Sequence, residues 1–452
     1  MTKVSFHTLG CKVNQYETEA MKEKFLKAGY EVMPDGSPAD IYIINTCTVT
    51  NLADRKSRQF IRRAKKLSLE SFVVATGCYV QVKPEEAAAI EGVDMIVGVN
   101  EKAKIFEYIE AELESRGKAG AATAHVLDYD ELSEYRSDGI ISAMEGKSRA
   151  FIKIEEGCNR FCSYCIIPFA RGKVRSRAPE EVVEEARQLI AAGFKEIVLT
   201  GINTALYGTD LGMGGIEPLI GMLDSLEGDF RIRLSSLEPT VINKEYVKSL
   251  LKYDKLCHHL HLSLQSGSDK ILAAMNRRYD RKDFLEIVQV LREFDPYYGI
   301  TSDIIAGFPG EDEEDFNDSL SMIRGAGIDR VHSFKYSKRE GTVAAGMSGQ
   351  VTDKVKQERG RVLQEVGEEV SLKRREMMKG IVRPVFLEEL VQKKGPSGEP
   401  SEEPSREVES FAAGYSDNYI RVYVRNAESL IGKLVDVRFG GIMEDGVEGI
   451  IE

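Results

Sequence analysis

The chain has 452 residues, of which 42% are hydrophobic and 30% charged, a balance typical of a soluble globular protein with about three domains. Its formal net charge of −12 excludes a protein that coats nucleic acid through a generally basic surface, although a local basic patch is compatible with it. There is no apolar run of about 18 residues and no N-terminal signal-peptide pattern, so we expect a cytoplasmic protein without a membrane segment.

Residues 1–115 alternate between strand and helix patterns, which predicts a parallel sheet covered by helices. The strands are expected at Val4–Leu9, Ile41–Asn45, Phe72–Ala75 and Met95–Val99. Helices are expected between them, for example at Thr18–Ala28 and Leu52–Leu67. Residues 116–147 are polar and weakly periodic, and they predict a linker.

Residues 148–375 alternate again and predict a second α/β domain. Six strands are expected, at Ala150–Ile154, Glu196–Leu199, Arg231–Leu234, His259–Leu264, Ile300–Ile305 and Arg330–Tyr336. A closed barrel of this type has about eight βα units, so six units predict an open, partial (β/α)6 barrel. Its active site is expected at the C-terminal ends of the strands.

The pattern changes towards the C-terminus. A charged helix at about Thr352–Lys379 leads to residues 380–452, which contain short strand patterns. These strands predict a small β-barrel of the oligonucleotide-binding type. Lys393–Arg406 is rich in glycine, proline, serine and glutamate and predicts a mobile loop within that barrel.

Seven cysteines are too few for a disulfide scaffold, and clustered cysteines in a reducing compartment indicate metal binding or catalysis. Cys158, Cys162 and Cys165 form a Cys-x3-Cys-x2-Cys motif after a predicted strand. Three thiolates on one loop can hold three irons of a [4Fe–4S] cluster and leave the fourth iron open to a ligand. The alternative is structural zinc, but zinc needs a fourth protein ligand nearby and the chain offers none at a suitable spacing.

This motif resembles the signature of the radical S-adenosylmethionine (SAM) superfamily, in which an aromatic residue, here Tyr164, precedes the third cysteine. The resemblance implies that SAM binds the open iron and is cleaved to a 5′-deoxyadenosyl radical, which the protein aims and shields from water. Polar or glycine-rich turns follow the second to fifth predicted barrel strands, where this superfamily binds SAM. The residues expected to bind SAM are Tyr164, Thr200, Gly201, Asn203, Ser236, Glu238, Gln265, Asp303 and Gly307. No catalytic residue beyond the cysteines is assigned.

Three further cysteines, Cys11, Cys47 and Cys78, each follow a predicted strand of the first sheet. The C-terminal ends of parallel strands share one edge, so these cysteines are expected to converge there. The alternative is three unrelated buried cysteines that pack as small hydrophobic residues. The repeated position at three strand ends favours a second three-cysteine cluster, whose open iron could hold a sulfide for delivery.

With these cysteines the resemblance extends to the methylthiotransferases and covers essentially the whole chain, including the C-terminal β-domain, which looks like the RNA-binding TRAM module of that family. It is carried by residues Thr8–Glu17, Asn45–Thr50 and Thr76–Tyr79. The Lys-Val-Asn-x-Tyr-Glu and Thr-Val-Thr endings resemble the branch that acts on threonylcarbamoyladenosine in tRNA, while Ser263, in place of an expected proline, departs from it.

The resemblance implies a reaction with two SAM molecules. One SAM methylates a sulfur at the N-terminal cluster, and the other yields the radical that abstracts hydrogen from C2 of the adenosine at position 37, next to the anticodon. The implied cofactors are two [4Fe–4S] clusters and SAM. The implied partners are tRNA carrying threonylcarbamoyladenosine and an electron donor such as flavodoxin or ferredoxin.

A basic stretch lies just after Cys47, and its residues Arg55, Arg58, Arg62 and Lys65 fall near one helical face. They are candidate contacts to RNA phosphates, although a merely solvated face is equally compatible with them. His259 and His261 share one face of a predicted strand, where barrel packing and catalysis explain them equally well.

Three other functions stay open. Within the family, the chain could methylthiolate isopentenyladenosine in tRNA or a ribosomal protein. From another class, it could be a non-catalytic Fe–S regulator that binds RNA. The polar turns at four successive strand ends oppose the regulator, because such a protein needs no SAM pocket.

Overall fold

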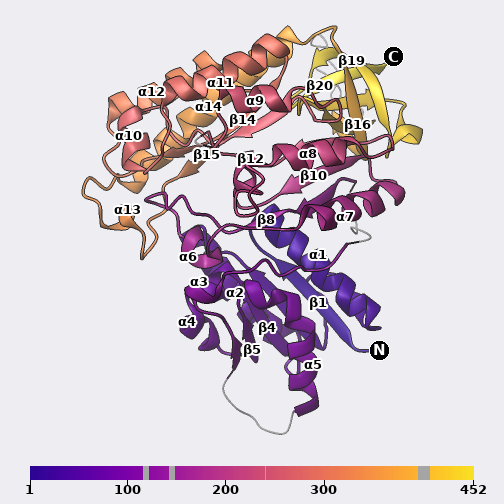
Figure 1. Ribbon diagram of the computed structural model, residues 1–452, viewed down its shortest axis with the longest axis vertical. Helices are drawn as coiled ribbons and strands as arrows, with labels where there is room; N and C mark the ends of the chain where they lie inside the picture. Colours follow the sequence, from indigo (N-terminus) through magenta and orange to yellow (C-terminus); the bar gives the residue numbers. More distant parts are fainter. Residues whose placement is uncertain (116–121, 142–147, 240, 395–407) are drawn as a thin grey trace.

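The computed structural model describes residues 1–115, 122–141, 148–239, 241–394 and 408–452 and shows three packed units (Figure 1). We call them the N-terminal unit (up to residue 141), the partial barrel (148 to about 346) and the C-terminal barrel (from 382). In Figure 1 the N-terminal unit lies below the partial barrel. The C-terminal barrel, in yellow, lies beside the partial barrel. No helix in these described ranges is long and apolar enough to cross a bilayer.

The N-terminal unit is built on one parallel sheet with the strand order β2-β1-β3-β4-β5-β6. Its strands are β1 (Lys3–Thr8), β2 (Glu31–Met33), β3 (Ile41–Thr46), β4 (Phe72–Gly77), β5 (Met95–Val97) and β6 (Thr123–His125). The central strands β3 and β4 are buried along their whole length, as continuous apolar strands with helices on both faces must be. The covering helices are α1 (Lys12–Lys27), α2 (Asn51–Leu67), α3 (Cys78–Val82), α4 (Pro84–Ala88) and α5 (Ile105–Ser115).

Strand β6 corrects one expectation. The segment around Thr123–His125 was predicted as part of a linker, but it pairs with β5 in parallel and extends the sheet. A three-residue edge strand is too short to show a recognisable alternation, so periodicity alone does not reveal it.

The partial barrel is formed by parallel strands in two short sheets. One sheet contains β7 (Ala150–Lys153), β10 (Glu196–Thr200) and β11 (Arg231–Leu234), and the other contains β12 (Ser236–Leu237), β13 (His259–Leu262), β14 (Gly299–Ala306) and β15 (Arg330–Lys335). Only Ser235 separates β11 from β12, so one strand position bends there and joins the two sheets. The six predicted strand positions are therefore present, and the predicted α/β fold class is confirmed.

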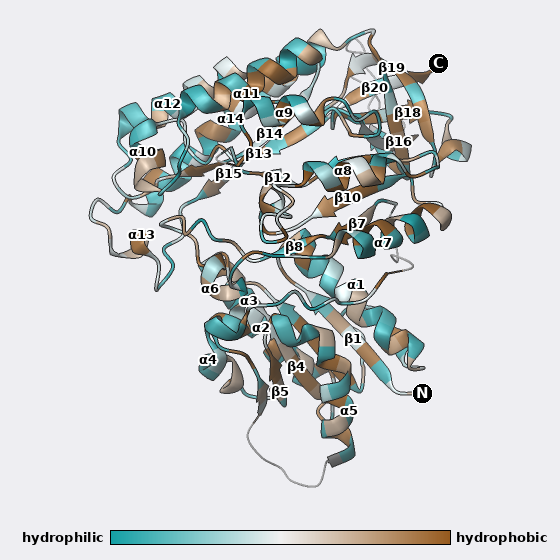
Figure 2. Ribbon diagram, in the orientation of Figure 1, coloured by the Kyte–Doolittle hydropathy of each residue, from teal (hydrophilic) through white to brown (hydrophobic). Residues whose placement is uncertain are grey.

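Helices cover the outside of the partial barrel, as Figure 1 shows. The main ones are α7 (Pro179–Ala191), α8 (Glu217–Asp224), α9 (Lys244–Leu250), α11 (Arg281–Phe294), α12 (Glu313–Ala326) and α14 (Asp353–Met377). Figure 2 shows apolar residues on their inner faces and on the strands, and polar residues on the outer faces. This division is what an apolar stripe at helical spacing produces when it packs on a sheet.

The C-terminal barrel is closed, with the strand order β16-β17-β18-β20-β19. Its strands are β16 (Val382–Lys394), β17 (Val408–Ser416), β18 (Arg421–Arg425), β19 (Leu434–Ile442) and β20 (Val447–Ile451). The loop predicted at Lys393–Arg406 lies almost entirely outside the described residues.

The turn between β17 and β18 attaches the C-terminal barrel to the partial barrel. Arg233 donates hydrogen bonds to the carbonyl oxygens of Ser416 (3.0 Å) and Asp417 (3.0 Å), and Arg231 donates to that of Tyr415 (2.8 Å). Both arginines are also paired with the buried Glu196. These buried, charge-assisted bonds fix the turn against the ends of the barrel strands.

Candidate functional site

The central cysteine loop follows β8 (Glu155–Glu156), which continues from β7. The Cys158 amide donates to the Gly172 carbonyl (3.0 Å), and the Cys165 amide donates to the Cys162 carbonyl (2.9 Å), so the loop is closed on itself. Burial raises the pKa of the Cys158 and Cys165 thiols to about 12, and the charge of Cys162 acts in the same direction on both. The structure thus brings the thiols of Cys158, Cys162 and Cys165 together on one loop.

Gly157 sets the direction of this loop. Its φ is +81°, and a Cβ atom there would overlap the Lys173 carbonyl group. We expect Gly157→Ala to prevent the loop from closing, to lower the free energy of unfolding by about 2–3 kcal/mol and to reduce iron content at the central site. Gly325→Ala, in open space on α12, is the control and is expected to be neutral or slightly stabilising. Iron analysis and denaturant unfolding of both variants check this, and equal iron content would contradict it.

The second set of cysteines lies at one edge of the N-terminal sheet. Thr8 is paired with Asn45 and Asn45 with Thr76, so the ends of β1, β3 and β4 are level. Cys11 therefore comes next to Cys47 and Cys78 although they are far apart in sequence. Burial raises the pKa of the Cys47 thiol to about 11, and the charges of Cys78 and Cys11 add to that rise. A Cβ on Gly10 would lie 3.1 Å from Cys47 Sγ, which shows how closely the Cys11 loop packs on that thiol.

Arg171 connects the two cysteine sets. It ends α6 (Ile167–Arg171), just after the central loop, and its side chain is fully buried. Its Nε donates to Cys78 Sγ (3.3 Å), and its guanidinium pairs with Glu17 (2.7 Å) and Glu156. The sequence analysis missed this residue, because the only signal was an arginine six positions after Cys165.

Several residues expected to bind SAM form one polar network beside the central loop. Glu238 accepts hydrogen bonds from Asn203 (2.7 Å) and from Arg277 (2.9 Å), and Arg277 also donates to the Tyr164 hydroxyl (2.6 Å). Arg160, within the cysteine loop, lies 3.3 Å from Glu238. The structure therefore brings Tyr164, Asn203 and Glu238 together through Arg277, which the sequence analysis did not identify.

Gln265 and Gly307 lie at the ends of the fourth and fifth barrel strand positions, and both have positive φ. The Gln265 backbone bonds on both sides to strand β14, through Asp303 and Ile305. The Gly307 amide donates to Glu311 (2.9 Å). These two turns hold the backbone in place, and Phe308, next to Gly307, contacts the Tyr164 ring of the Glu238 network.

A cavity of about 380 Å³ runs between the three units. Cys11 and Lys12 line it from the N-terminal unit, and Tyr419 lines it from the C-terminal barrel. The lining from the partial barrel includes Thr200, Gly201, Ser235, Ser236, His259, His261, Thr301, Asp303 and His332. The N-terminal cysteine edge and four of the residues expected to bind SAM therefore face the same space.

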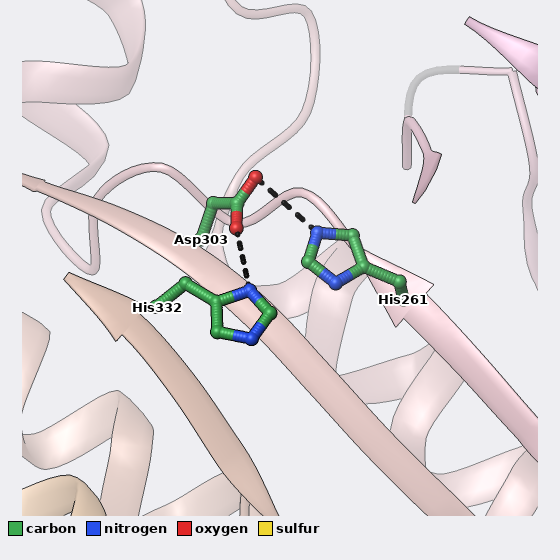
Figure 3. A group of neighbouring side chains, drawn as sticks. All are labelled: His261, Asp303 and His332. Atoms are coloured by element: carbon green, nitrogen blue, oxygen red, sulfur yellow. Dashed lines mark hydrogen bonds and ion pairs between the residues drawn. The ribbon is translucent and has the colours of Figure 1, made fainter. Parts of the chain in front are cut away.

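Asp303 lies between two imidazoles inside this cavity (Figure 3). Its carboxylate oxygens are 3.3 Å from His261 Nε2 and 3.2 Å from His332 Nδ1. Burial alone would raise the pKa of Asp303, but its hydrogen bonds to the two histidines outweigh burial and hold the pKa well below its usual range. The three side chains could share a metal ion, but both ring nitrogens of His261 already face Asp303 and Thr301 (3.0 Å), so we interpret them as a hydrogen-bonded group.

The basic face predicted on α2 is present in part. Arg55 and Arg62 are exposed, and together with Arg58, Gln59, Arg63 and Lys66 they line a shallow groove. Arg58 is paired with Glu86 (2.9 Å). Lys65 corrects the expectation, because its ammonium is paired with Asp94 (3.0 Å) and bonded to the Ser71 carbonyl instead of facing solvent.

Known proteins resemble this chain over nearly its full length. Residues 152–323 match the radical SAM superfamily, and residues 3–98 match the uncharacterized protein family UPF0004. Over 97% of its length the chain is 42% identical to the threonylcarbamoyladenosine tRNA methylthiotransferase MtaB of Bacillus subtilis, of which it covers 94%. The same-named protein of Thermotoga maritima is 36% identical over 99% of this chain and 96% of its own.

Two further proteins match this chain over less of its length. A tRNA-2-methylthio-N(6)-dimethylallyladenosine synthase of Caldicellulosiruptor saccharolyticus is 37% identical over 84% of this chain and 81% of its own. Among solved structures, the radical SAM methyltransferase TsrM from Kitasatospora setae matches 88% of this chain and 78% of its own, with a TM-score of 0.57 at 15% identity. That structural likeness supports the fold alone.

Proposed function

From the premise that this chain belongs to the methylthiotransferase family of radical SAM enzymes, we propose that it converts N6-threonylcarbamoyladenosine at position 37 of tRNA to its 2-methylthio derivative. The observation that carries the proposal is the cavity between the three units, where the N-terminal cysteine edge meets residues of the barrel interior. A sulfur held at that edge and a radical formed at the central loop could then reach one substrate atom.

The two cysteine sets suit [4Fe–4S] clusters. All six thiols are free, and each set offers three soft ligands close together. Burial leaves the pKa of the Cys78 thiol above its ordinary value, and the nearby charges of Arg171 and Lys102 offset part of that rise. With SAM bound, the central cluster supplies a 5′-deoxyadenosyl radical.

The residues of the chain would bind and orient SAM and the substrate, and they would exclude water. Arg277, Glu238 and Asn203 form a fixed polar wall beside the central loop that can orient SAM. Asp303, held by His261 and His332, presents a fixed acceptor inside the cavity. The β17–β18 turn closes the far side of the cavity and limits the access of water.

We further propose that the protein acts in the cytoplasm and takes electrons from a small donor such as flavodoxin or ferredoxin. Two alternative substrates, isopentenyladenosine and a ribosomal protein, find no specific support in the site. The non-catalytic regulator is disfavoured, because the polar network at the central loop has no role in a protein that only binds RNA.

The function is tested with anaerobically reconstituted protein. We expect about eight irons per chain, release of 5′-deoxyadenosine, and the 2-methylthio nucleoside in tRNA that carries threonylcarbamoyladenosine. Nucleoside mass spectrometry measures the product, and tRNA carrying isopentenyladenosine is the control substrate. Product from the control substrate alone would contradict the proposal.

We propose that the exposed basic residues of α2 contact tRNA phosphates. Arg55→Ala combined with Arg62→Ala is expected to weaken tRNA binding and to reduce the slope of log K against log salt by about two, or about one for each lost phosphate contact. The control, Arg361→Ala with Lys373→Ala, removes the same charge from the exposed surface of α14. Equal slopes for both double variants, measured by binding titration at several salt concentrations, would argue against this surface.

A further inference from the structure

Lys12 provides an unpaired positive charge in the cavity between the three units. It follows Cys11, lines the cavity, and forms no ion pair or hydrogen bond with the part of the chain that the structure describes. Arg233 lines the same cavity, but its guanidinium already makes four hydrogen bonds, two to Glu196 and two to carbonyl groups. Asp303 is the acidic residue of the lining, and it is held by two histidines. Among the charged residues of the lining, Lys12 is therefore the one that can pair with a ligand.

The electrostatics of the cavity favour an anion next to Lys12. Burial alone would raise the pKa of Tyr419, but the positive charges of Lys12, Arg149 and Arg233 outweigh burial and lower that pKa. His259 stacks on Tyr419 with ring centroids 4.5 Å apart. Burial, together with the charges of Arg233 and Lys12, holds the pKa of His259 well below its usual range, so this imidazole is neutral. A neutral histidine can donate a hydrogen bond without adding charge.

Apart from His261 Nε2, which is paired with Asp303, two buried polar atoms in the same lining lack a partner among the described residues. His259 is 3% exposed, and its Nε2 lies 3.0 Å from the Thr301 hydroxyl, but its Nδ1 has no hydrogen-bond partner among the described residues. The Ser235 hydroxyl, at the bend between β11 and β12, is also buried without a partner there. Because buried polar groups in native proteins are nearly always hydrogen-bonded, these atoms indicate a ligand with polar groups of its own.

We propose that Lys12, Ser235 and His259 form the subsite for the N6 substituent of the substrate adenosine, and that the Lys12 ammonium binds its carboxylate. This inference rests on the proposed function and extends it to substrate choice. A threonylcarbamoyl group carries a carboxylate, a hydroxyl and a urea-type carbonyl, whereas a dimethylallyl group carries no polar atom. The unpaired ammonium and the two polar atoms without partners can bind the polar groups of the threonylcarbamoyl substituent. A dimethylallyl substituent would leave them unpaired and would therefore bind less well.

The first test uses the unaltered enzyme. Two anticodon hairpins are compared, one with the threonylcarbamoyl group and one in which its carboxylate is replaced by a neutral carboxamide of nearly the same shape. We expect kcat/KM to be higher for the carboxylate hairpin by about 30-fold, since the carboxamide hairpin cannot form the ion pair with the Lys12 ammonium. Equal values for the two hairpins would overturn the inference. No product from the carboxylate hairpin would instead overturn the proposed function.

The second test removes the charge. Lys12→Met keeps the length of the side chain, and we expect it to lower kcat/KM for the carboxylate hairpin by about 30-fold and for the carboxamide hairpin by less than about threefold. Lys27→Met, at the exposed far end of the same helix, is the matched control. Iron content and 5′-deoxyadenosine release without RNA confirm that the clusters assemble. An equal decrease in kcat/KM for both hairpins would overturn the assignment. A lysine that supported only the fold or the binding of phosphates would affect the carboxylate and carboxamide hairpins equally.

Discussion

Replacing one cysteine of each set is expected to separate the two halves of the reaction. Cys158→Ala should reduce 5′-deoxyadenosine release below detection, because two thiolates do not hold the central cluster in a form that binds SAM. Both variants should fail to form the methylthio nucleoside. Cys78→Ala, however, should leave 5′-deoxyadenosine release measurable. The difference follows from the structure, in which the two cysteine sets belong to different units and Arg171, just after the central loop, contacts Cys78 of the other set.

Cys257 offers a control within the same chain. It is buried, lies outside both sets, and its amide bonds to the Ile232 carbonyl (2.8 Å). Cys257→Ala is expected to keep about eight irons and both products, whereas the other two variants should each keep about four irons. Anaerobic iron analysis, 5′-deoxyadenosine release and nucleoside mass spectrometry measure these quantities. If Cys78→Ala still formed the methylthio nucleoside, the N-terminal cysteines would not be the site that presents sulfur.

The cysteine positions were predictable because the rule that places them is local. Each of Cys11, Cys47 and Cys78 follows an apolar strand, and strands that read as parallel bring their C-terminal ends to one edge. The register Thr8–Asn45–Thr76 then brings the cysteines together without further information. The spacing of Cys158, Cys162 and Cys165 is equally local. Both sets could therefore be proposed before any contact was known.

Residues that act across units could not be found in this way. Arg277 reaches Glu238 and Tyr164, and Tyr419 enters the cavity from the third unit on a turn with φ +68°. Nothing in the surrounding sequence distinguishes these residues from surface arginines and tyrosines, because their partners lie far away along the chain. The same limitation explains why the prediction for Lys65 was wrong. Its position on the helix predicted an exposed side chain, but its partner Asp94 lies in a later loop.

Arg171 is the residue for which we expect the largest loss of stability. Its guanidinium is fully buried and pairs with Glu17 and Glu156, and it also donates to Asn14 Oδ1 (2.6 Å) and to Cys78 Sγ. Burial alone would raise the pKa of Glu17, but Arg171, the largest of the nearby positive charges acting on it, helps to hold that pKa well below its usual range. The arginine thus stabilises a buried carboxylate that could not otherwise be charged.

Arg171→Met is expected to lower the free energy of unfolding by about 3–5 kcal/mol, because it leaves buried carboxylates with too little positive charge. Lys102 and Lys153 would still pair with Glu17 in this variant. We therefore expect a loss towards the lower end of that range. Arg187→Met removes an exposed pair with Glu184 and should leave the free energy of unfolding nearly unchanged. The first transition in denaturant unfolding measures both, since a chain of several units does not unfold in a single step. If the two variants had equal midpoints, the buried pairs would contribute no more than a surface one. In that case Arg171 would act mainly on the Cys78 thiol, and its loss should appear in the iron content instead of in stability.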